Sequence, residues 1–235
     1  MTELYTEVIA FVTNLDSVFF IALPYVALFT FFLVTIQRYR NQAFTFSSLS
    51  SQLLENKNHF WTIVPFHYGI LFVLLGHIVA FLVPRSILAW NGHPIRLYIL
   101  EITALSAGLL AVVGMIGMIV RRISDPKVRV VTSRIDVVLY FLLLTQLISG
   151  VAVAIFHPWG SSWFATTMTP YLWSVVKFQP DITYIVGLPW LVKLHIINAL
   201  LLILIFPFTR LVHILVVPNP YLWRKPQVVR WYGRG

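Results

Sequence analysis

The residues of this chain best suited to chemistry are its histidines, because cysteine is absent from the 235-residue sequence. Without cysteine, disulfides, thiolate nucleophiles and thiolate-bound iron are excluded, and any redox chemistry must rest on imidazole. Four of the seven histidines, His67, His77, His195 and His213, lie within strongly apolar stretches. Ionisable groups in such surroundings are costly and usually functional, so these four are the candidate ligands.

The other three histidines, His59, His93 and His157, fall at the edges of apolar stretches or between them. We expect them to be interfacial or solvated side chains. The sequence has no Ser-His-Asp arrangement and no phosphate-binding loop that would suggest hydrolytic or nucleotide chemistry.

The composition places the chain in a membrane. Hydrophobic residues make up 59% of it and charged residues 11%, with a mean hydropathy of +0.83. Soluble domains are about 45–50% apolar and about 25% charged, so a soluble fold of this size would lack the interior to hold these residues. A membrane-spanning helix needs about 20 apolar residues, and five stretches approach or exceed that length: residues 18–36, 60–84, 102–120, 137–156 and 188–217.

No repeat or linker divides the sequence. The expected fold class is therefore all-α, a five-span transmembrane helical bundle over residues 1–217 with a tail at residues 218–235. Span three is rich in small residues, which suits close packing of helices; these are Gly108, Gly114 and Gly117.

Lysine and arginine are distributed unequally between the two ends of these spans. Thirteen of the seventeen lie after span one, after span three or from Arg210 onward, and the other side has Arg85, Arg96, Lys177 and Lys193. Cytoplasmic loops carry an excess of basic residues, so we expect the N-terminus outside and the C-terminus in the cytoplasm, across the cytoplasmic (inner) cell membrane.

The net charge of +9 then reflects these basic loops and their contact with anionic lipid rather than binding of nucleic acid. Residues 1–16 have no Lys or Arg and so lack the basic start of a signal peptide.

The direction of the spans predicts how the four histidines pair. Span two runs outward and span five inward, so His67 lies on the cytoplasmic side with His213, and His77 on the outer side with His195. Helical rise separates His67 from His77 by about 15 Å and His195 from His213 by about 27 Å. Eighteen residues make five turns, which predicts that His195 and His213 share one face of one helix, with Pro207 able to kink it between them.

Two facing imidazoles in apolar surroundings are what a six-coordinate b-type haem requires. The sequence therefore predicts two haems between spans two and five. Gly69 and Gly76 flank the span-two histidines and would let a macrocycle approach the helix. Arg210, three residues before His213, could pair with a haem propionate or could instead extend its charge to the membrane surface.

A bare transition-metal ion fits this pattern less well, since such a site would normally add carboxylates or thiolates. Glu101 and Asp136 are the acids near span ends, and neither is expected among the histidines. Two histidines on each iron leave no open coordination position, so we expect electron transfer rather than oxygen or substrate chemistry at iron.

Two segments outside the spans carry further expectations. Residues 157–187 should lie outside, with a short helix over residues 169–178 on the membrane face and Tyr171 and Trp173 at the headgroups, or else a plain aromatic belt. The tail at residues 218–235 combines basic and aromatic residues, which suit docking to a partner subunit or contact with anionic lipid.

Four stretches resemble the γ subunit of respiratory nitrate reductase, a five-span dihaem cytochrome b that anchors a cytoplasmic molybdenum and iron–sulfur pair. They are FHYGILFVLLGH (residues 66–77), RRISDPKVRVVTSRIDVVL (residues 121–139), FPFTRLVHILVVP (residues 206–218) and YLWRKPQVVR (residues 221–230). The likeness runs from span two to the C-terminus and includes the 10- and 18-residue spacings between histidines.

The resemblance implies that His67 and His213 bind the haem nearer the cytoplasm, and that His77 and His195 bind the outer haem. It implies that quinol is oxidised beside the outer haem, with protons released outside. Electrons then pass inward to an iron–sulfur subunit and a molybdenum catalytic subunit on the cytoplasmic face. Family members tend to carry a lysine near the quinol after span two, where the nearest basic residue here is Arg96.

Other functions are also compatible with these residues. A related cytochrome b could serve another reductase, for example one for sulfur compounds. The histidines could form the relay of a proton channel or transporter, although the sequence lacks the repeats common in transporters. The chain could also be a structural anchor without a cofactor, but its buried histidines would then be energetically costly and serve no function.

Overall fold

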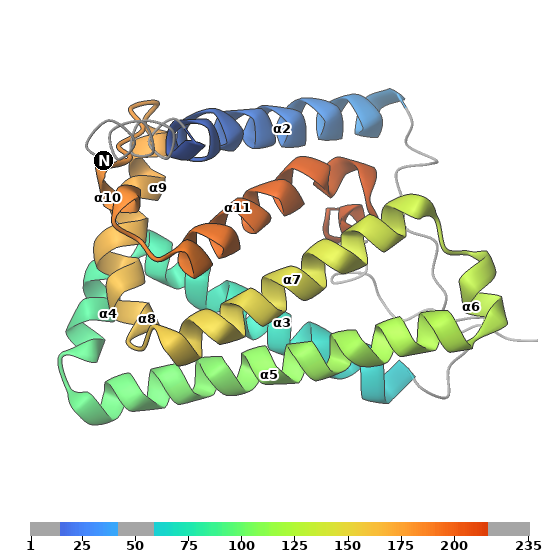
Figure 1. Cartoon of the computed structure of the whole chain (residues 1–235), viewed down its shortest axis with the longest axis horizontal. Coiled ribbons are helices and arrows are strands. Elements are labelled where there is room, and N and C mark those ends of the chain that lie inside the picture. Colours follow the sequence, from blue (N-terminus) through green and yellow to red (C-terminus); the bar gives the residue numbers. More distant parts are fainter. Residues whose placement is uncertain (1–14, 42–58, 216–235) are drawn as a thin grey trace, which may run out of the picture.

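Five long helices lie alongside one another in the computed structural model, which describes residues 15–41 and 59–215 (Figure 1). Each is long and apolar enough to cross a membrane: Leu15–Asn41, Phe60–Leu82, Pro94–Ser124, Arg134–Phe156 and Trp190–Phe208. Only 17–22% of each apolar segment is buried inside the protein, which leaves the outer faces for lipid. The predicted all-α bundle with five candidate spans is confirmed, and the predicted tail at residues 218–235 lies outside the described residues.

The long helices pack in a chain of neighbours. In that order they are α2 (Leu23–Asn41), α11 (Trp190–Ile205), α7 (Arg134–Phe156), α5 (Pro94–Ser124) and α3 (His59–Leu82). The two helices expected to carry the histidine ligands, α3 and α11, are therefore backed by different partners, α5 and α7.

Small residues let α5 approach its neighbours closely, as the sequence predicted. A Cβ added to Gly114 would overlap the backbone of Phe66 on α3, and one added to Gly117 would lie 2.8 Å from Cγ2 of Thr62. Gly108 faces α7 instead. Close backbone approach of this kind is how helices associate in lipid, where no hydrophobic force drives them together.

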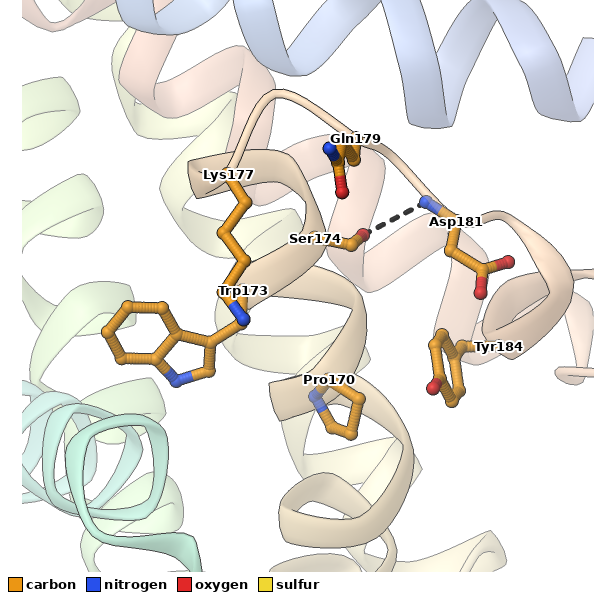
Figure 2. A pocket seen from close by; sticks show the side chains of 7 residues that line it. All are labelled: Pro170, Trp173, Ser174, Lys177, Gln179, Asp181 and Tyr184. Carbon is orange, nitrogen blue, oxygen red and sulfur yellow. Dashed lines mark hydrogen bonds between the residues drawn. The ribbon is translucent and has the colours of Figure 1, made fainter.

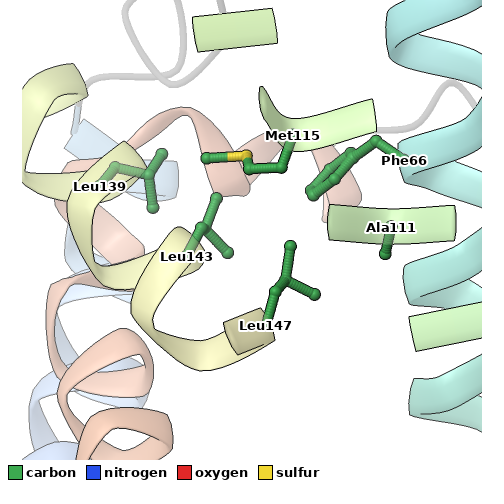
Figure 3. Close-up of a cluster of buried hydrophobic side chains, with 6 residues drawn as sticks. All are labelled: Phe66, Ala111, Met115, Leu139, Leu143 and Leu147. Atoms are coloured by element: carbon green, nitrogen blue, oxygen red, sulfur yellow. The ribbon is translucent and has the colours of Figure 1, made fainter. Parts of the chain in front are cut away.

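A buried apolar cluster joins α3, α5 and α7 (Figure 3). Its members are Phe66, Ala111, Met115, Leu139, Leu143 and Leu147. The leucines recur every four residues along one face of α7, the spacing expected for a helix face that packs on its neighbours. The cluster fixes α7 against the helix pair α3–α5, and Leu202 and Ile205 of α11 also pack against it.

Short helices cover one end of the bundle. They are α4 (Pro84–Asn91), α8 (Gly160–Trp163), the π-helical η2 (Phe164–Met168), α9 (Thr169–Val176) and α10 (Thr183–Val186). The helix predicted over residues 169–178 is thus present as α9 and ends two residues earlier. It packs on α3, where Trp173 stacks on Phe81 with ring centroids 5.0 Å apart and donates its indole N–H to the Phe81 carbonyl at 3.2 Å.

Tyr171 departs from its expected place at the headgroups. It is 1% exposed and donates its hydroxyl to the Phe20 carbonyl at 2.8 Å. Phe20 belongs to the π-helical turn η1 (Val18–Ala22) that precedes α2. Pro24 has no N–H with which to close an α-helical turn onto this carbonyl, so the hydroxyl satisfies an acceptor inside the protein. Burial also raises the pKa of Tyr171 above its ordinary value, so its hydroxyl keeps the proton that it donates.

The expectation that span five continues as one helix to residue 217 is wrong. The α-helix α11 ends at Ile205, a 3₁₀ turn η3 (Phe206–Phe208) follows, and Thr209 is extended with φ −113° and ψ 176°. A second 3₁₀ turn, η4 (Arg210–Ile214), then begins. Pro207 explains the break, because its ring clashes with the preceding turn and it donates no hydrogen bond. His195 and His213 consequently do not share one face of one straight helix.

The end of the bundle opposite the short helices holds α6 (Pro126–Val130) together with η3 and η4. Asp125 starts α6 by accepting a hydrogen bond from the Lys127 amide at 2.9 Å. Ser133 starts α7 through a capping box with Asp136. Local capping of this kind explains why both helices begin where they do.

Candidate haem sites

His67 and His213 face each other, as the sequence predicted for the pair nearer the cytoplasm. Their ring centroids are 6.3 Å apart and their ring planes meet at 73°. Nδ1 of His67 bonds the Ile63 carbonyl at 2.8 Å, and Nδ1 of His213 bonds the Arg210 carbonyl at 2.6 Å. A carbonyl only accepts, so each Nδ1 carries the proton and each Nε2 keeps its lone pair. We call these two residues the inner pair.

The spacing of the inner pair suits one metal ion held between two imidazoles. Two metal–nitrogen bonds of about 2 Å, plus about 1.1 Å from each nitrogen to its ring centre, give about 6 Å between centroids. Within residues 15–41 and 59–215, no group of three or more His, Cys, Asp or Glu side chains could hold a metal ion. A two-imidazole set fits haem iron, whose macrocycle supplies the other four ligands, better than it fits a bare ion.

His77 and His195 form the second predicted pair, which we call the outer pair. His77 lies on α3 with Nδ1 2.9 Å from the Val73 carbonyl, and its ring meets Phe164 edge-on at 5.2 Å between centroids. His195 lies on α11, where side chains of α7 hold its ring. Since Phe164 belongs to the layer of short helices, the outer pair lies toward that end of the bundle.

The side chains that hold His195 were missed in the sequence. Ser149 Oγ lies 2.9 Å from its Nδ1, and Gln146 Nε2 lies 3.1 Å from its Nε2. Asn198, which is 3% exposed, donates to the Gln146 side-chain carbonyl at 2.7 Å. Polar side chains inside apolar spans were the available signal, because such groups need partners at membrane depth.

The two glycines beside the span-two histidines differ from each other. A Cβ on Gly69 would lie 2.5 Å from the Ala107 carbonyl oxygen of α5. The expectation that Gly69 leaves room for a macrocycle is therefore wrong, because it serves helix packing. A Cβ on Gly76 would have nothing within 4 Å, so that position is open as predicted. A third glycine, Gly150, was missed: its Cβ would lie 2.9 Å from Cε1 of His195.

Arg210 makes a forked ion pair with Asp136 at the start of α7. Its Nε donates to Oδ1 at 2.6 Å and its Nη2 donates to Oδ2 at 2.9 Å. Nη2 also donates to the Val131 carbonyl at 2.7 Å, and Asp136 is 1% exposed. Asp136 therefore supports His213 indirectly, because it holds the residue whose carbonyl binds the His213 ring. Pairing of Arg210 with a propionate stays a prediction.

The three remaining histidines lie at helix ends, as expected. His59 begins α3, His93 is the residue before α5, and His157 is the residue after α7. Arg96, in the first turn of α5, lies over the Trp90 ring at 5.5 Å, and its carbonyl accepts the Trp90 indole N–H at 3.1 Å.

A shallow pocket of about 340 Å³ opens on the layer of short helices. Figure 2 shows the side chains that line it: Pro170, Trp173, Ser174, Lys177, Gln179, Asp181 and Tyr184. Ser174 Oγ accepts the Asp181 amide at 2.9 Å, which ties α9 to the following loop. Trp173 connects the pocket to Phe81, one helical turn beyond His77.

The sequence is similar to known proteins over most of its length. The profile of the family described as nitrate reductase gamma subunit matches residues 16–232. The nitrate reductase gamma chain of Bacillus subtilis is 33% identical over 211 residues, covering 88% of this chain and 95% of its own. The respiratory nitrate reductase 1 gamma chain of Escherichia coli is 31% identical over 221 residues, covering 92% and 97%. The chain therefore belongs to the nitrate reductase gamma subunit family.

Proposed function

We propose that this chain is the dihaem, quinol-oxidising membrane anchor of a respiratory nitrate reductase. Membership of the family supports the anchor role. The observation that carries the haem assignment is the inner pair, whose rings are 6.3 Å apart with both Nδ1 atoms bound to carbonyls. His67 and His213 would hold the inner haem, and His77 and His195 the outer haem.

The protein's own groups prepare these ligands. Each Nδ1 is engaged by a carbonyl or hydroxyl oxygen, which leaves the Nε2 lone pair as the one for coordination and makes Nε2 a stronger donor. Haem, when bound, would supply reversible one-electron chemistry, and two histidines of this chain would hold each iron. The ligands therefore suit electron transfer and leave no place on the iron for substrate.

The two pairs lie toward opposite ends of the bundle, which suits transfer across a membrane. The outer pair contacts the short-helix layer through Phe164. The inner pair belongs to the end that holds α6, because Arg210 of η4 bonds Val131 just after α6. The basic residues at the α6 end support a cytoplasmic location for that end, because cytoplasmic loops carry an excess of Lys and Arg.

Quinol oxidation at the outer end would then conserve energy. Oxidation of one quinol to quinone releases two protons and two electrons, with the protons leaving outside and the electrons delivered to the cytoplasmic face. Each charge moved across the membrane is worth about 2.3 kcal/mol per 100 mV. The electrons would be received by an iron–sulfur subunit and passed to a molybdenum catalytic subunit. Residues 218–235 are our candidate docking tail.

The test is the haem content of two histidine variants in the membrane complex. His77→Leu should lose the outer haem and quinol oxidation, whereas His213→Leu should lose the inner haem and keep the outer one. His93→Gln, at a helix end outside both pairs, is the matched control and should keep two haems. If both ligand variants retain two haems, the assignment of ligands is wrong.

A further inference from the structure

His195 is held differently from the other three candidate ligands. His67, His77 and His213 each place Nδ1 on a backbone carbonyl of their own helix or turn, at 2.8, 2.9 and 2.6 Å. His195 instead places Nδ1 on the hydroxyl of Ser149, a side chain of the neighbouring helix α7. A backbone carbonyl is fixed whatever the residue type, so His195 is the ligand whose support depends on side-chain identity.

The donor and the acceptor of each hydrogen bond around His195 can be assigned by starting from a backbone carbonyl, which only accepts. The Leu142 carbonyl can only accept, so the Asn198 atom 2.9 Å from it is the amide nitrogen Nδ2. The same Nδ2 donates to Gln146 at 2.7 Å, which makes that atom of Gln146 the side-chain oxygen. The nitrogen Nε2 of Gln146 is thereby the atom turned toward His195.

A second backbone carbonyl fixes the direction in which the Ser149 hydroxyl donates its proton. Ser149 Oγ donates its single proton to the Gln146 main-chain carbonyl at 3.1 Å. Toward His195 Nδ1, at 2.9 Å, it can then only accept. Nδ1 of His195 therefore carries the ring proton.

The remaining nitrogen of His195 must be an acceptor. Gln146 Nε2 lies 3.1 Å from His195 Nε2 and 3.3 Å from Nδ1. Because Nδ1 is protonated, the amide donates to the lone pair on Nε2. That lone pair is the one a metal would use, and iron would take it in place of the amide.

We propose that Ser149, Gln146 and Asn198 act as positioning residues that fix His195 as the Nδ1–H tautomer and set its strength as a ligand. The inference rests on the proposed function, in which His195 binds the outer haem. An acceptor on Nδ1 makes an imidazole more basic and favours ferric iron. Removing the Ser149 hydroxyl should therefore raise the midpoint potential of the outer haem.

The experiment compares Ser149→Ala and Ser149→Thr in the intact membrane complex. Redox titration followed by electron paramagnetic resonance measures the midpoint potential and the low-spin g values of each haem, with the inner haem as internal reference. Ser149→Ala should shift the outer haem's potential upward and change its g values, while Ser149→Thr should restore both toward the unsubstituted protein. Asn198→Leu, which removes the bond that orients Gln146, should also change the outer haem's g values.

Thr103→Val is the matched control, since the Thr103 hydroxyl bonds two carbonyls of its own helix, at 2.7 and 3.0 Å. It should leave both haems unchanged. Loss of the outer haem in Ser149→Ala but not in Ser149→Thr would also support the proposal. An outer haem with unchanged potential and g values in both Ser149→Ala and Asn198→Leu would overturn it. A haem-free protein, or an outer haem that survives His195→Leu, would contradict the proposed function instead.

Discussion

At the scale of single residues, the candidate ligands use one ring nitrogen for support and leave the other for coordination. In His67 and His77 the support is the carbonyl four residues earlier on α3. Helix geometry itself therefore selects the tautomer that presents Nε2. Ligand strength at these positions should be insensitive to substitutions elsewhere on the helix surface.

Gly150 tests how closely α7 must approach His195. In Gly150→Ala the new Cβ would lie 2.9 Å from Cε1 and 3.5 Å from Nδ1 of His195. The ring or the helix must move, at a cost of about 1–3 kcal/mol for overpacking. We expect a lower content of outer haem and a lower Tm of the detergent-solubilised complex, measured by haem assay and thermal unfolding.

Gly187→Ala provides the control for this prediction. A Cβ at Gly187 meets nothing within 4 Å, so haem content and Tm should both stay at their starting values. A Gly150→Ala protein with a full outer haem and unchanged Tm would show that α7 does not constrain His195.

The sequence identified the ligand candidates because residue type and apolar surroundings are visible in it. It did not separate Gly69 from Gly76, since both flank a histidine and only the packing of α5 on α3 shows which face is covered. It did not join Asp136 to Arg210, which are 74 positions apart and meet only when η4 folds back onto α7.

At the scale of elements, the turn η4 that carries His213 depends on its anchor to α7. The anchor is the forked pair between Arg210 and the buried Asp136. Two parallel hydrogen bonds fix a guanidinium in orientation as well as position. The backbone of η4, and with it the carbonyl that binds His213, is thereby held beside the start of α7.

Asp136→Asn should release this anchor. Breaking a buried ion pair by removing one charge costs about 3–5 kcal/mol, so we expect a lower Tm and a loss of inner haem. The outer haem should remain, because its ligands lie on α3 and α11. Haem-specific redox titration of the variant distinguishes the two haems.

Asp125→Asn is the control, since Asp125 caps α6 at the same end of the bundle through the Lys127 amide. It should keep both haems. An Asp136→Asn protein that retains a full inner haem would show that the ion pair does not position His213.

The elements themselves were predictable to different degrees. Apolar length was enough to place the spans, and the short helix expected over residues 169–178 is present as α9. The end of span five was not, although Pro207 marked it. A proline shows that a helix is disturbed, but the contacts of the residues that follow decide whether the chain kinks or turns back.

At the scale of the whole molecule, the two ends of the bundle differ in charge and in structure. One end carries the short helices and the pocket beside Trp173. The other carries α6 and the basic residues that follow α5. We expect the α6 end to face the cytoplasm, where a partner would receive electrons.

The absence of cysteine from the sequence makes this orientation easy to measure. Single cysteines at Gln179→Cys and Lys127→Cys would lie on exposed residues at opposite ends. A membrane-impermeant maleimide should label Gln179→Cys in intact spheroplasts and Lys127→Cys only after lysis. The reverse pattern would mean that the proposed direction of electron transfer is wrong.

The measurement that most directly tests the dihaem assignment is the haem content of the purified membrane complex, by absorption spectrum and pyridine haemochrome assay. Four axial histidines predict about two low-spin b-type haems per chain. A colourless preparation from haem-replete cells, or a protein that keeps both haems after substitution of either histidine pair, would contradict the account.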